Sequence, residues 1–360
     1  MNLDSYIKSQ GWSFYGVVPI NQVQDALKKH QKTFKEWIKN GNQADMSYLE
    51  RMEEDRFHPE NKLPDVKSII VLGAIYRQET GNKKQDTAES CGRVAKYAVG
   101  RDYHKVLKKK LIKLSEYLKS EIVNLSAGRQ GHKSVTETYI SVDSGPTVDR
   151  VLAETAGLGY FGKNSCLINP KHGSFFFIAS LMINVELEPL AISRMPNCGD
   201  CTKCLDSCPT GALSSPGVVD ARKCISYLTI ENKGSIPIEF REKMGNRLFG
   251  CDACQDCCPF NQRDVSCTID DLRSQFGVGD LLSLKDILKI KTDEEFLKQF
   301  AGTPIMRTKR IGLLRNACIA SGNTKDQSLI PYLKKLIEQE SDKMLIEHAE
   351  WGINEIEKNK

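Results

Sequence analysis

The stretch Cys198-Gly-Asp-Cys201-Thr-Lys-Cys204-Leu-Asp-Ser-Cys208-Pro209 decides how this chain is organised. Three cysteines at three-residue intervals, followed by a cysteine and a proline, have the spacing with which proteins hold 4Fe–4S clusters. A second, partial motif, Cys251-x-x-Cys254-x-x-x-Cys258-Pro259, follows, and Cys224 lies between the two. The pattern predicts two 4Fe–4S clusters and a chain that transfers electrons.

The cysteines fall into two interlocked ligand sets, because the cysteine before the proline in such motifs ligates the other cluster. We expect one cluster to be held by Cys198, Cys201, Cys204 and Cys258, and the other by Cys208, Cys224, Cys251 and Cys254. Cys257 is then a spare thiol. Cys91, Cys166, Cys267 and Cys318 stand alone in the sequence and are interpreted as buried or incidental thiols.

Disulfides and structural zinc are the alternative uses of these cysteines. The N-terminal segment MNLDSYIKSQ is polar and amphipathic and has no features of a signal peptide or twin-arginine leader, which favours a reducing, cytoplasmic location over disulfides. Zinc sites commonly use two separated C-x-x-C pairs. Three evenly spaced cysteines followed by Cys-Pro therefore favour iron–sulfur clusters.

The composition is that of a globular protein. A length of 360 residues predicts two or three domains, and the apolar fraction of 40% is ordinary. The apolar runs SIIVLGAIY and FFFIASLMINV are far shorter than the roughly 18 residues that span a bilayer, so no membrane span is expected. The formal net charge of +5 is counted without the clusters, and by itself it does not indicate a polyanionic partner. Nothing indicates an assembly surface, so a monomer is expected.

Residues 1–188 have the pattern of an α/β domain. Helical periodicity is present over 2–10, 22–40, 102–124 and 147–155, and strand patterning over 13–20, 68–76 and 136–143, with a polar loop over 78–90. A Gly-rich turn over 156–164 precedes two extended segments, 166–170 and 174–185, which we expect to close the domain as a hairpin.

The rest of the chain divides into two parts. Residues 189–267 show little periodicity, as expected where clusters replace a hydrophobic core, and form a ferredoxin-like module. Residues 268–360 are predicted to form a helical domain with helical segments from residue 283 onward, and the last three of these segments resemble HEAT-type helical hairpin repeats.

Three further segments carry a resemblance to a known family. They are Tyr97-Ala-Val-Gly-Arg-Asp-Tyr-His104, Val142-Asp143-Ser-Gly-Pro146 followed by Arg150, and Ala156-Gly-Leu-Gly-Tyr-Phe-Gly-Lys-Asn164. Together with the cluster motifs and the segment 223–231, they closely resemble epoxyqueuosine reductases over nearly the whole chain. The resemblance implies a cobalamin-dependent enzyme that reduces epoxyqueuosine to queuosine at the wobble position of tRNA. Cobalamin would lie on a nitroreductase-like α/β domain and receive electrons from the clusters, which an unidentified donor charges.

Asp143 is the candidate catalytic acid. It follows a predicted strand and precedes Ser-Gly-Pro, and a carboxylic acid there could protonate the opened epoxide if burial raised its pKa. The alternative is an Asx turn or an N-cap on the next helix. By the same resemblance, the expected cobalamin contacts are Arg56, Tyr97, Asp143, Gly162, Lys163, Asn164, Ser226 and Tyr227.

Two motifs argue against other cofactor assignments. The cobalamin signature D-x-H-x-x-G is absent, because Leu107 stands where glycine belongs after Asp102-Tyr-His104, so no histidine ligand is expected and His104 is interpreted as a helix-start or surface residue. The glycines of 157–162 approximate a dinucleotide fingerprint, but they follow a predicted helix instead of opening one after a strand.

Basic residues supply candidate contacts to the phosphates of tRNA. They are Lys105, Lys108, Lys109, Lys110, Arg307, Lys309 and Arg310, any of which could equally belong to a solvated helix face. Two other functions are kept open. One is a corrinoid iron–sulfur reductase similar to reductive dehalogenases, and the other is a non-catalytic ferredoxin-type electron-transfer protein.

Overall fold

The N-terminal part of the chain is built on one antiparallel sheet. The computed structural model describes residues 2–77, 90–126, 137–190, 195–263 and 265–358. Its four-stranded sheet has the order β1 (Phe14–Pro19), β2 (Ser68–Ile75), β7 (Phe176–Ile183) and β4 (Thr138–Ser141). Every residue of β2 is buried, because both faces of the sheet are covered by helices.

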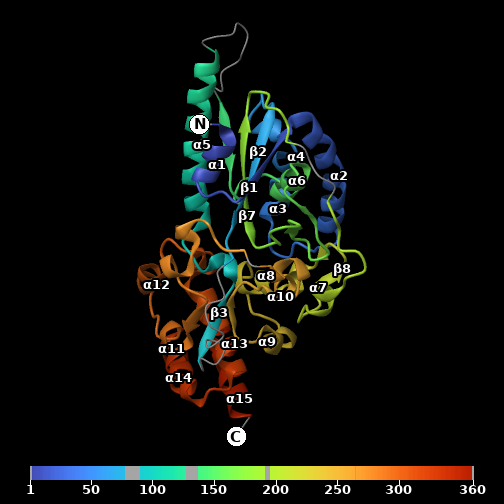
Figure 1. The fold of residues 1–360 in the computed structure, drawn as a ribbon. Coiled ribbons are helices and arrows are strands. Elements are labelled where there is room, and N and C mark those ends of the chain that lie inside the picture. The colour runs from blue at the N-terminus through green and yellow to red at the C-terminus, as the bar shows by residue number, and fades with distance from the viewer. Residues whose placement is uncertain (1, 78–89, 127–136, 191–194, 264, 359–360) are drawn as a thin grey trace.

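Helices form a layer on each face of this sheet (Figure 1). On one face lie α1 (Leu3–Ser9) and α5 (Tyr103–Ser126); on the other lie α2 (Ile20–Lys39), α4 (Glu53–Phe57) and α6 (Asp149–Thr155), with the short α3 (Tyr48–Arg51) below them. Side chains alternate along β2, so that Leu72 packs with Leu107 of α5 while Val71 packs with Leu27 of α2. The helices and strands predicted up to residue 155 are confirmed. The predicted loop over 78–90 lies almost wholly outside the described residues.

The predicted closing hairpin is wrong. β6 (Leu167–Ile168) pairs with β5 (Tyr160–Phe161), whereas β7 enters the main sheet between β2 and β4. A single bridge joins Asn169 of the first predicted arm to Gly173, which lies just before the second arm. Because β7 is apolar on both faces, both faces are buried only when the strand lies at the centre of a sheet that is covered on both sides.

Short elements make up the cluster module and longer helices the C-terminal part. The module contains α7 (Lys203–Asp206), β8 (Leu213–Ser215), β9 (Val218–Val219), α8 (Ile225–Ile230), α9 (Ile238–Met244), β10 (Arg247–Phe249) and α10 (Ala253–Asp256). The C-terminal part contains α11 (Leu284–Ile287), α12 (Asp293–Phe300), α13 (Lys309–Thr324), α14 (Ile330–Gln339) and α15 (Lys343–Glu357), which confirms the predicted helices. It also contains one strand that was not predicted, β11 (Leu281–Ser283). Within the described residues, no helix is both long enough and apolar enough to cross a membrane.

One strand joins all three predicted regions. β3 (Cys91–Val94) pairs in parallel with β10 of the cluster module and antiparallel with β11 of the C-terminal part. In Figure 1 this cyan strand lies among the orange and red elements of the lower half, away from the N-terminal sheet. The predicted boundaries near residues 188 and 267 therefore separate segments that share a sheet.

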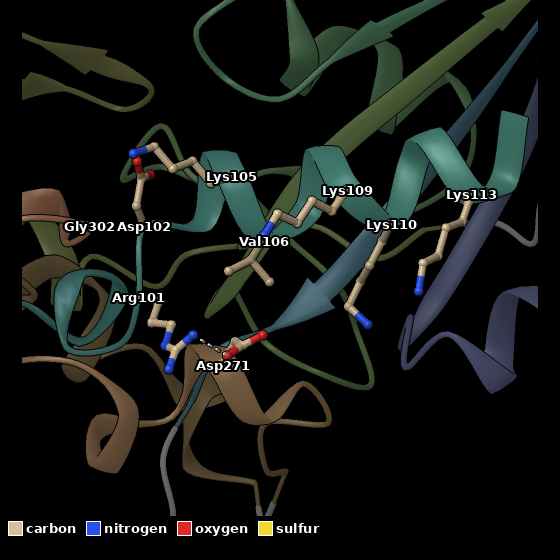
Figure 2. A pocket seen from close by; sticks show the side chains of 9 residues that line it. All are labelled: Arg101, Asp102, Lys105, Val106, Lys109, Lys110, Lys113, Asp271 and Gly302. Carbon is tan, nitrogen blue, oxygen red and sulfur yellow. Dashed lines mark ion pairs between the residues drawn. The ribbon is translucent and has the colours of Figure 1, made fainter.

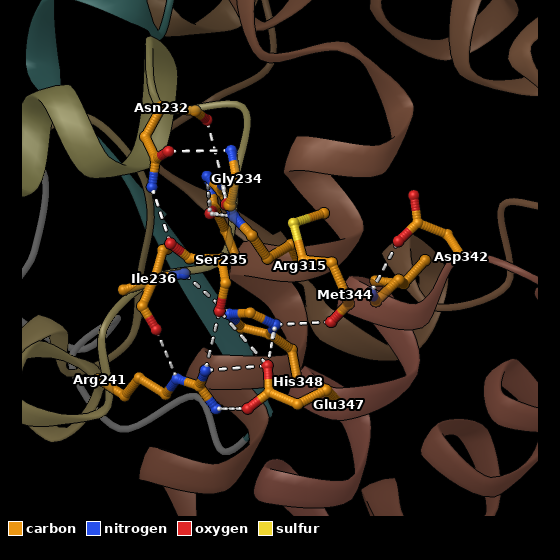
Figure 3. Close-up of polar contacts among 12 residues, drawn as sticks. Asn232, Gly234, Ser235, Ile236, Arg241, Arg315, Asp342, Met344, Glu347 and His348 are labelled. Atoms are coloured by element: carbon orange, nitrogen blue, oxygen red, sulfur yellow. Dashed lines mark hydrogen bonds and ion pairs between the residues drawn. The ribbon is translucent and has the colours of Figure 1, made fainter. Parts of the chain in front are cut away.

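Buried polar contacts fix the C-terminal helices to residues 228–241 of the cluster module (Figure 3). Arg241 of α9 forms a 2.7 Å ion pair with Glu347 of α15 and donates to the Ile236 carbonyl. His348 Nε2 accepts from the Ile236 N–H at 3.1 Å, so Nδ1 carries the hydrogen and donates to the Met344 carbonyl.

Arg315 of α13 completes this contact surface. It is fully buried, and its guanidinium donates to the carbonyls of Leu228, Asn232 and Gly234 at 2.7 to 2.9 Å. A buried charge is stable only when it is fully hydrogen-bonded, so these contacts define one position of the module against the helices.

Candidate active site and cluster module

The first predicted set of cluster ligands is brought together by the fold. Cys198, Cys201, Cys204 and Cys258 line one small cavity, and Cys258 comes from a segment more than fifty residues away in the sequence. Cys198 and Cys201 lie just before α7, Cys204 lies in its first turn, and Cys258 follows α10. The remaining wall of this cavity includes Lys163, Asn164 and Phe260.

The second predicted set is clustered as well. Burial raises the pKa of Cys224, and the nearby thiols of Cys251 and Cys208 raise it further. Burial likewise raises the pKa of Cys251, again with a contribution from Cys208. Cys254 is close enough to Cys224 and Cys251 to feel both. Four partly buried thiols that feel one another's charge can ionise together only with compensating positive charge, which iron would provide.

The Gly-rich turn faces this module instead of an open cavity. Lys163 Nζ donates to the Gly199 carbonyl at 2.6 Å, and Asn164 Nδ2 donates to the Cys254 carbonyl at 3.1 Å. A Cβ at position 162 would lie 2.5 Å from Cδ1 of Ile168 and 2.7 Å from Oδ1 of Asn164, so a larger residue there would displace these two side chains. We expected these three residues to hold cobalamin, but both side chains are used to bind the two cysteine-bearing loops, and the Gly162 N–H is taken by Cys166.

Asp143 lies in a tight loop two residues beyond the end of β4. Its φ of +55° is in the left-handed region, where aspartate is one of the few tolerated residues other than glycine. The carboxylate accepts a 2.5 Å hydrogen bond from the Tyr103 hydroxyl and lies 3.5 Å from His104 Nε2, and 64% of the side chain is exposed. It does not cap the next helix, whose N-cap is Val148, so the alternative of a capping aspartate is wrong.

His104 is a functional candidate that the sequence reasoning set aside. It stands at the start of α5, as expected, but it bridges two carboxylates: Nδ1 is 2.8 Å from Asp102 and Nε2 faces Asp143. Burial alone would lower the pKa of this imidazole, but the hydrogen bonds and charges of the two aspartates raise it to about 9. His104 is therefore a cation at neutral pH.

The expected raised pKa of Asp143 is wrong. Enclosure by the surrounding protein would raise it, but the hydrogen bonds from His104 and Tyr103 and the positive charges nearby lower the pKa overall. Asp149, at the start of α6, shows the opposite behaviour: burial and the charge of Asp143 raise its pKa to about 7. The site thus holds an ionised carboxylate beside two groups that carry protons near neutral pH.

Residues from three elements surround Asp143. Arg56 of α4 and Tyr48 of α3 are close enough to interact with its charge, as is Tyr97, which packs against Tyr103 with ring centroids 6.2 Å apart. Arg56 Nε is buried and has no hydrogen-bond partner among the described residues. A buried donor without an acceptor suggests a place for a polar ligand.

Some of the residues predicted to contact cobalamin or tRNA phosphates are engaged in contacts within the protein. Ser226 lies in the first turn of α8, but the Tyr227 hydroxyl is occupied by Asp45, to which it donates at 2.9 Å. Arg310 is paired with Glu340 and lies within the C-terminal helices, so it is not the exposed phosphate contact that we predicted. Lys309 is exposed.

Arg307 faces the site in an ion pair. It forms two hydrogen bonds to Glu231 and lies 5.9 Å from the centroid of the Tyr48 ring. Asp102, Tyr103 and Glu231 lie in segments that carried the family resemblance, but they were not named as site residues, and Tyr48 lies in none of those segments. Their roles depend on contacts between segments far apart in the chain.

A short segment connects the site with the second cysteine set. The Lys96 N–H donates to the Asp252 carboxylate at 2.9 Å, and the Ala95 N–H donates to the Phe249 carbonyl at 2.8 Å. Asp252 lies between Cys251 and Cys254, and Tyr97 packs on Tyr103, which bonds Asp143. The second set of cysteines is therefore one short chain of contacts from Asp143.

Two cysteine sets docked against an α/β domain with a proton-carrying carboxylate–histidine site define an iron–sulfur oxidoreductase. The model of a 4Fe–4S double cluster binding domain matches residues 197–261, and the model described as epoxyqueuosine reductase QueG, DUF1730, matches residues 56–144. An epoxyqueuosine reductase of Francisella cf. novicida is 38% identical over 93% of this chain and 91% of its own length. The chain belongs to the epoxyqueuosine reductase family.

Solved structures agree with this assignment. The structure of epoxyqueuosine reductase from Streptococcus thermophilus matches with a TM-score of 0.84 and 28% identity, over 99% of this chain and 91% of that one. A crystal structure of epoxyqueuosine reductase with an epoxyqueuosine-modified tRNA-Tyr stem loop matches with a TM-score of 0.80 and 32% identity, over 98% and 89%.

Proposed function

We propose that this chain reduces epoxyqueuosine to queuosine in tRNA, using cobalamin in the N-terminal domain and two 4Fe–4S clusters in the cluster module. The observation that carries the proposal is the short path of contacts from the second cysteine set to the Asp143–His104 site, in a chain that matches epoxyqueuosine reductases along almost its full length. A relative solved with a modified tRNA stem loop supports tRNA as the substrate.

The residues around Asp143 fit a polar, planar cofactor. The unpartnered Arg56 Nε offers a donor, Tyr97 offers an aromatic surface, and Asp143 provides oxygen atoms, while Ser226 is included on the family resemblance. These residues would hold cobalamin, with Lys163 and Asn164 acting through the cluster loops that they bind. Reduced cobalamin would supply a strong nucleophile and source of electrons at the epoxide.

The protein's own task at this site is to deliver protons. Converting an epoxide to an alkene removes its oxygen as water and consumes two electrons and two protons. His104 is protonated at neutral pH, and its Nε2 lies 3.5 Å from the open Asp143 carboxylate. In this mechanism Asp143 relays one proton from His104 to the substrate oxygen while Tyr103 holds the carboxylate in position, and the second proton comes from solvent through the exposed side of Asp143.

The electrons follow the order of the two cysteine sets. The set that includes Cys208 and Cys251 is joined to the site through Lys96 and Tyr97, so its cluster would be the immediate donor. The set that includes Cys198 lies beyond it and would receive electrons from an external reductant of unknown identity.

Finer features of the family are proposed on the same basis. They are a nitroreductase-like N-terminal domain, HEAT-like packing of α13, α14 and α15, a cytoplasmic location and a monomeric state. Neither the resemblance to reductive dehalogenases nor a ferredoxin-type role accounts for the Asp143–His104 site as well.

Anaerobic turnover tests the proposal. Protein reconstituted with iron, sulfide and cobalamin is incubated with a chemical reductant and tRNA carrying epoxyqueuosine, and the released nucleosides are analysed by mass spectrometry. We expect a product lighter by one oxygen atom, formed by the wild-type protein and by an Asp286→Asn control, whose exposed pair with Lys289 is on α11. Survival of the epoxide in protein that holds both clusters and cobalamin would overturn the proposal.

A further inference from the structure

A basic groove runs along α5 from the candidate active site. It has a volume of about 340 Å³ and is lined by Arg101, Lys105, Lys109, Lys110 and Lys113, with Asp102, Asp271, Val106 and Gly302 completing the wall. Figure 2 shows the lysines extending from successive turns of the helix, with Asp271 opposite them. Five basic and two acidic side chains thus line this groove.

The two acidic residues are already paired. Asp271 lies 3.4 Å from Arg101, and Asp102 is bonded to His104 at 2.8 Å. Lys110 is partly buried and donates to the Gln10 carbonyl. Lys105, Lys109 and Lys113 remain exposed and form no ion pair with a described residue. Their charges are therefore available to an anionic partner.

The spacing of these lysines gives the groove a direction. Lys105, Lys109 and Lys113 are four residues apart on one face of the helix, which extends them over about 12 Å. A row of positive charges at regular intervals suits a partner with regularly repeated negative charges, such as a nucleic-acid backbone. A single small anion would need only one convergent cluster.

The groove also shares a residue with the active site. Asp102 lines the groove and bonds His104, whose other ring nitrogen faces Asp143. A strand lying along α5 would therefore reach Asp143 at its Lys105 end. Enzymes that modify an RNA base in a loop splay the base out of its stack, which places the flanking phosphates on the protein surface beside the site.

We propose that this groove binds the phosphate backbone of the RNA strand next to the base that enters the active site. The proposal rests on the proposed function for its substrate, and it adds the path that the RNA follows along α5. Lys105, Lys109 and Lys113 bind phosphates in this arrangement, and Arg101 and Asp271 form the opposite wall. Lys108 is exposed but is not part of the groove, so it makes no contribution.

The test measures the salt dependence of RNA binding. A fluorescent anticodon stem-loop RNA carrying epoxyqueuosine is titrated with cluster-loaded protein at several KCl concentrations, and the dissociation constant is measured by anisotropy. Loss of each phosphate contact lowers the slope of log K against log salt by about 0.7 to 0.9. The double variant Lys109→Gln/Lys113→Gln should therefore lose about 1.5 in slope and roughly 30-fold in affinity at 0.1 M salt.

Matched controls separate this groove from general charge effects. Lys28→Gln/Lys32→Gln removes two exposed lysines from α2, on the opposite face of the sheet, and should change neither affinity nor slope. Lys108→Gln, one residue from the groove on the same helix, should also be neutral. Unchanged affinity and slope in the Lys109/Lys113 variant, or an equal loss in the α2 control, would overturn the proposal.

Failure of the proposed function gives a different result. If the Lys109/Lys113 variant lost affinity and salt slope while the wild-type protein bound the RNA and left the epoxide intact, the groove would be supported and the proposed reaction refuted. If the wild-type protein reduced the epoxide while the Lys109/Lys113 variant bound RNA as tightly as the wild-type protein, the proposed reaction would be supported and the proposed groove refuted.

Discussion

The protonation of His104 can be changed by one substitution that keeps its surroundings. Asp102 lies 2.8 Å from His104 Nδ1, and together with Asp143 it raises the pKa of His104 to about 9. Asp102→Asn removes the charge and keeps an oxygen that can accept from Nδ1 and from the His104 N–H. An opposite charge at this distance changes a pKa by about 1 to 3, and with 36% of the imidazole exposed we expect a decrease of about 1 to 2.

The sign of the effect follows from which form is active. The protonated form of His104 delivers the proton, so activity is present below its pKa and is lost as the pH rises through it. The wild-type protein should lose kcat/KM above about pH 9, and Asp102→Asn should lose it above about pH 7 to 8.

The assay is the pH profile of kcat/KM for reduction of tRNA-bound epoxyqueuosine under anaerobic conditions. NMR titration of the His104 ring, assigned by comparison with His104→Gln, gives the same pKa without turnover. Asp286→Asn, which removes an exposed carboxylate far from the site, should leave both midpoints unchanged. An unshifted alkaline midpoint in Asp102→Asn, or an intact alkaline limb in His104→Gln, would refute the assigned proton donor.

Three other outcomes are expected. Asp143→Asn should reduce turnover by about 10² to 10⁴ while the absorbance of clusters and cobalamin is retained, and a fully active variant would remove Asp143 from the mechanism. Arg315→Met should lower the free energy of unfolding by about 3 to 5 kcal/mol in urea titrations, because it leaves the carbonyls of Leu228, Asn232 and Gly234 without donors. The control Lys334→Met, at an exposed position, should change the free energy of unfolding by less than about 0.5 kcal/mol. Burial lowers the pKa of His348 to about 4, below its unfolded value near 6.5, so the free energy of unfolding should fall as the pH decreases from about 6.5 to 4. The variant His348→Gln should lose this pH dependence. Parallel curves of unfolding free energy against pH for the two proteins would contradict this expectation.

Much of the fold could be predicted from the sequence because its signals are local. The short apolar runs of β1 and β2, the periodicity of α2 and α5, and the helices after residue 283 are each contained in one segment. The partner of β7 could not be predicted, since strand pairing depends on which other strands need a central neighbour. β3 was missed for a related reason: four residues are too few for a pattern, and its partners lie far along the chain.

The same distinction applies to the candidate site. The cysteine sets could be proposed from the sequence because ligand spacing is dictated by cluster geometry, and Asp143 could be proposed because of the family resemblance of its Val-Asp-Ser-Gly-Pro segment. The pKa of Asp143 was predicted in the wrong direction, because burial was considered without the hydrogen bonds from Tyr103 and His104. Those bonds form between α5 and the loop after β4, and the sequence pattern of neither segment predicts this contact.

The position of β3 has a consequence for synthesis on the ribosome. Residues 91–94 emerge early, but their partners in β10 and β11 are completed only when residue 283, about 190 residues later, has been made. At about 5 to 20 residues per second, this strand stays unpaired for roughly 10 to 40 seconds. Its exposed backbone is open to association with other chains during that interval. Slow translation of the cysteine-rich region should therefore reduce the soluble yield more than slow translation of the last helices.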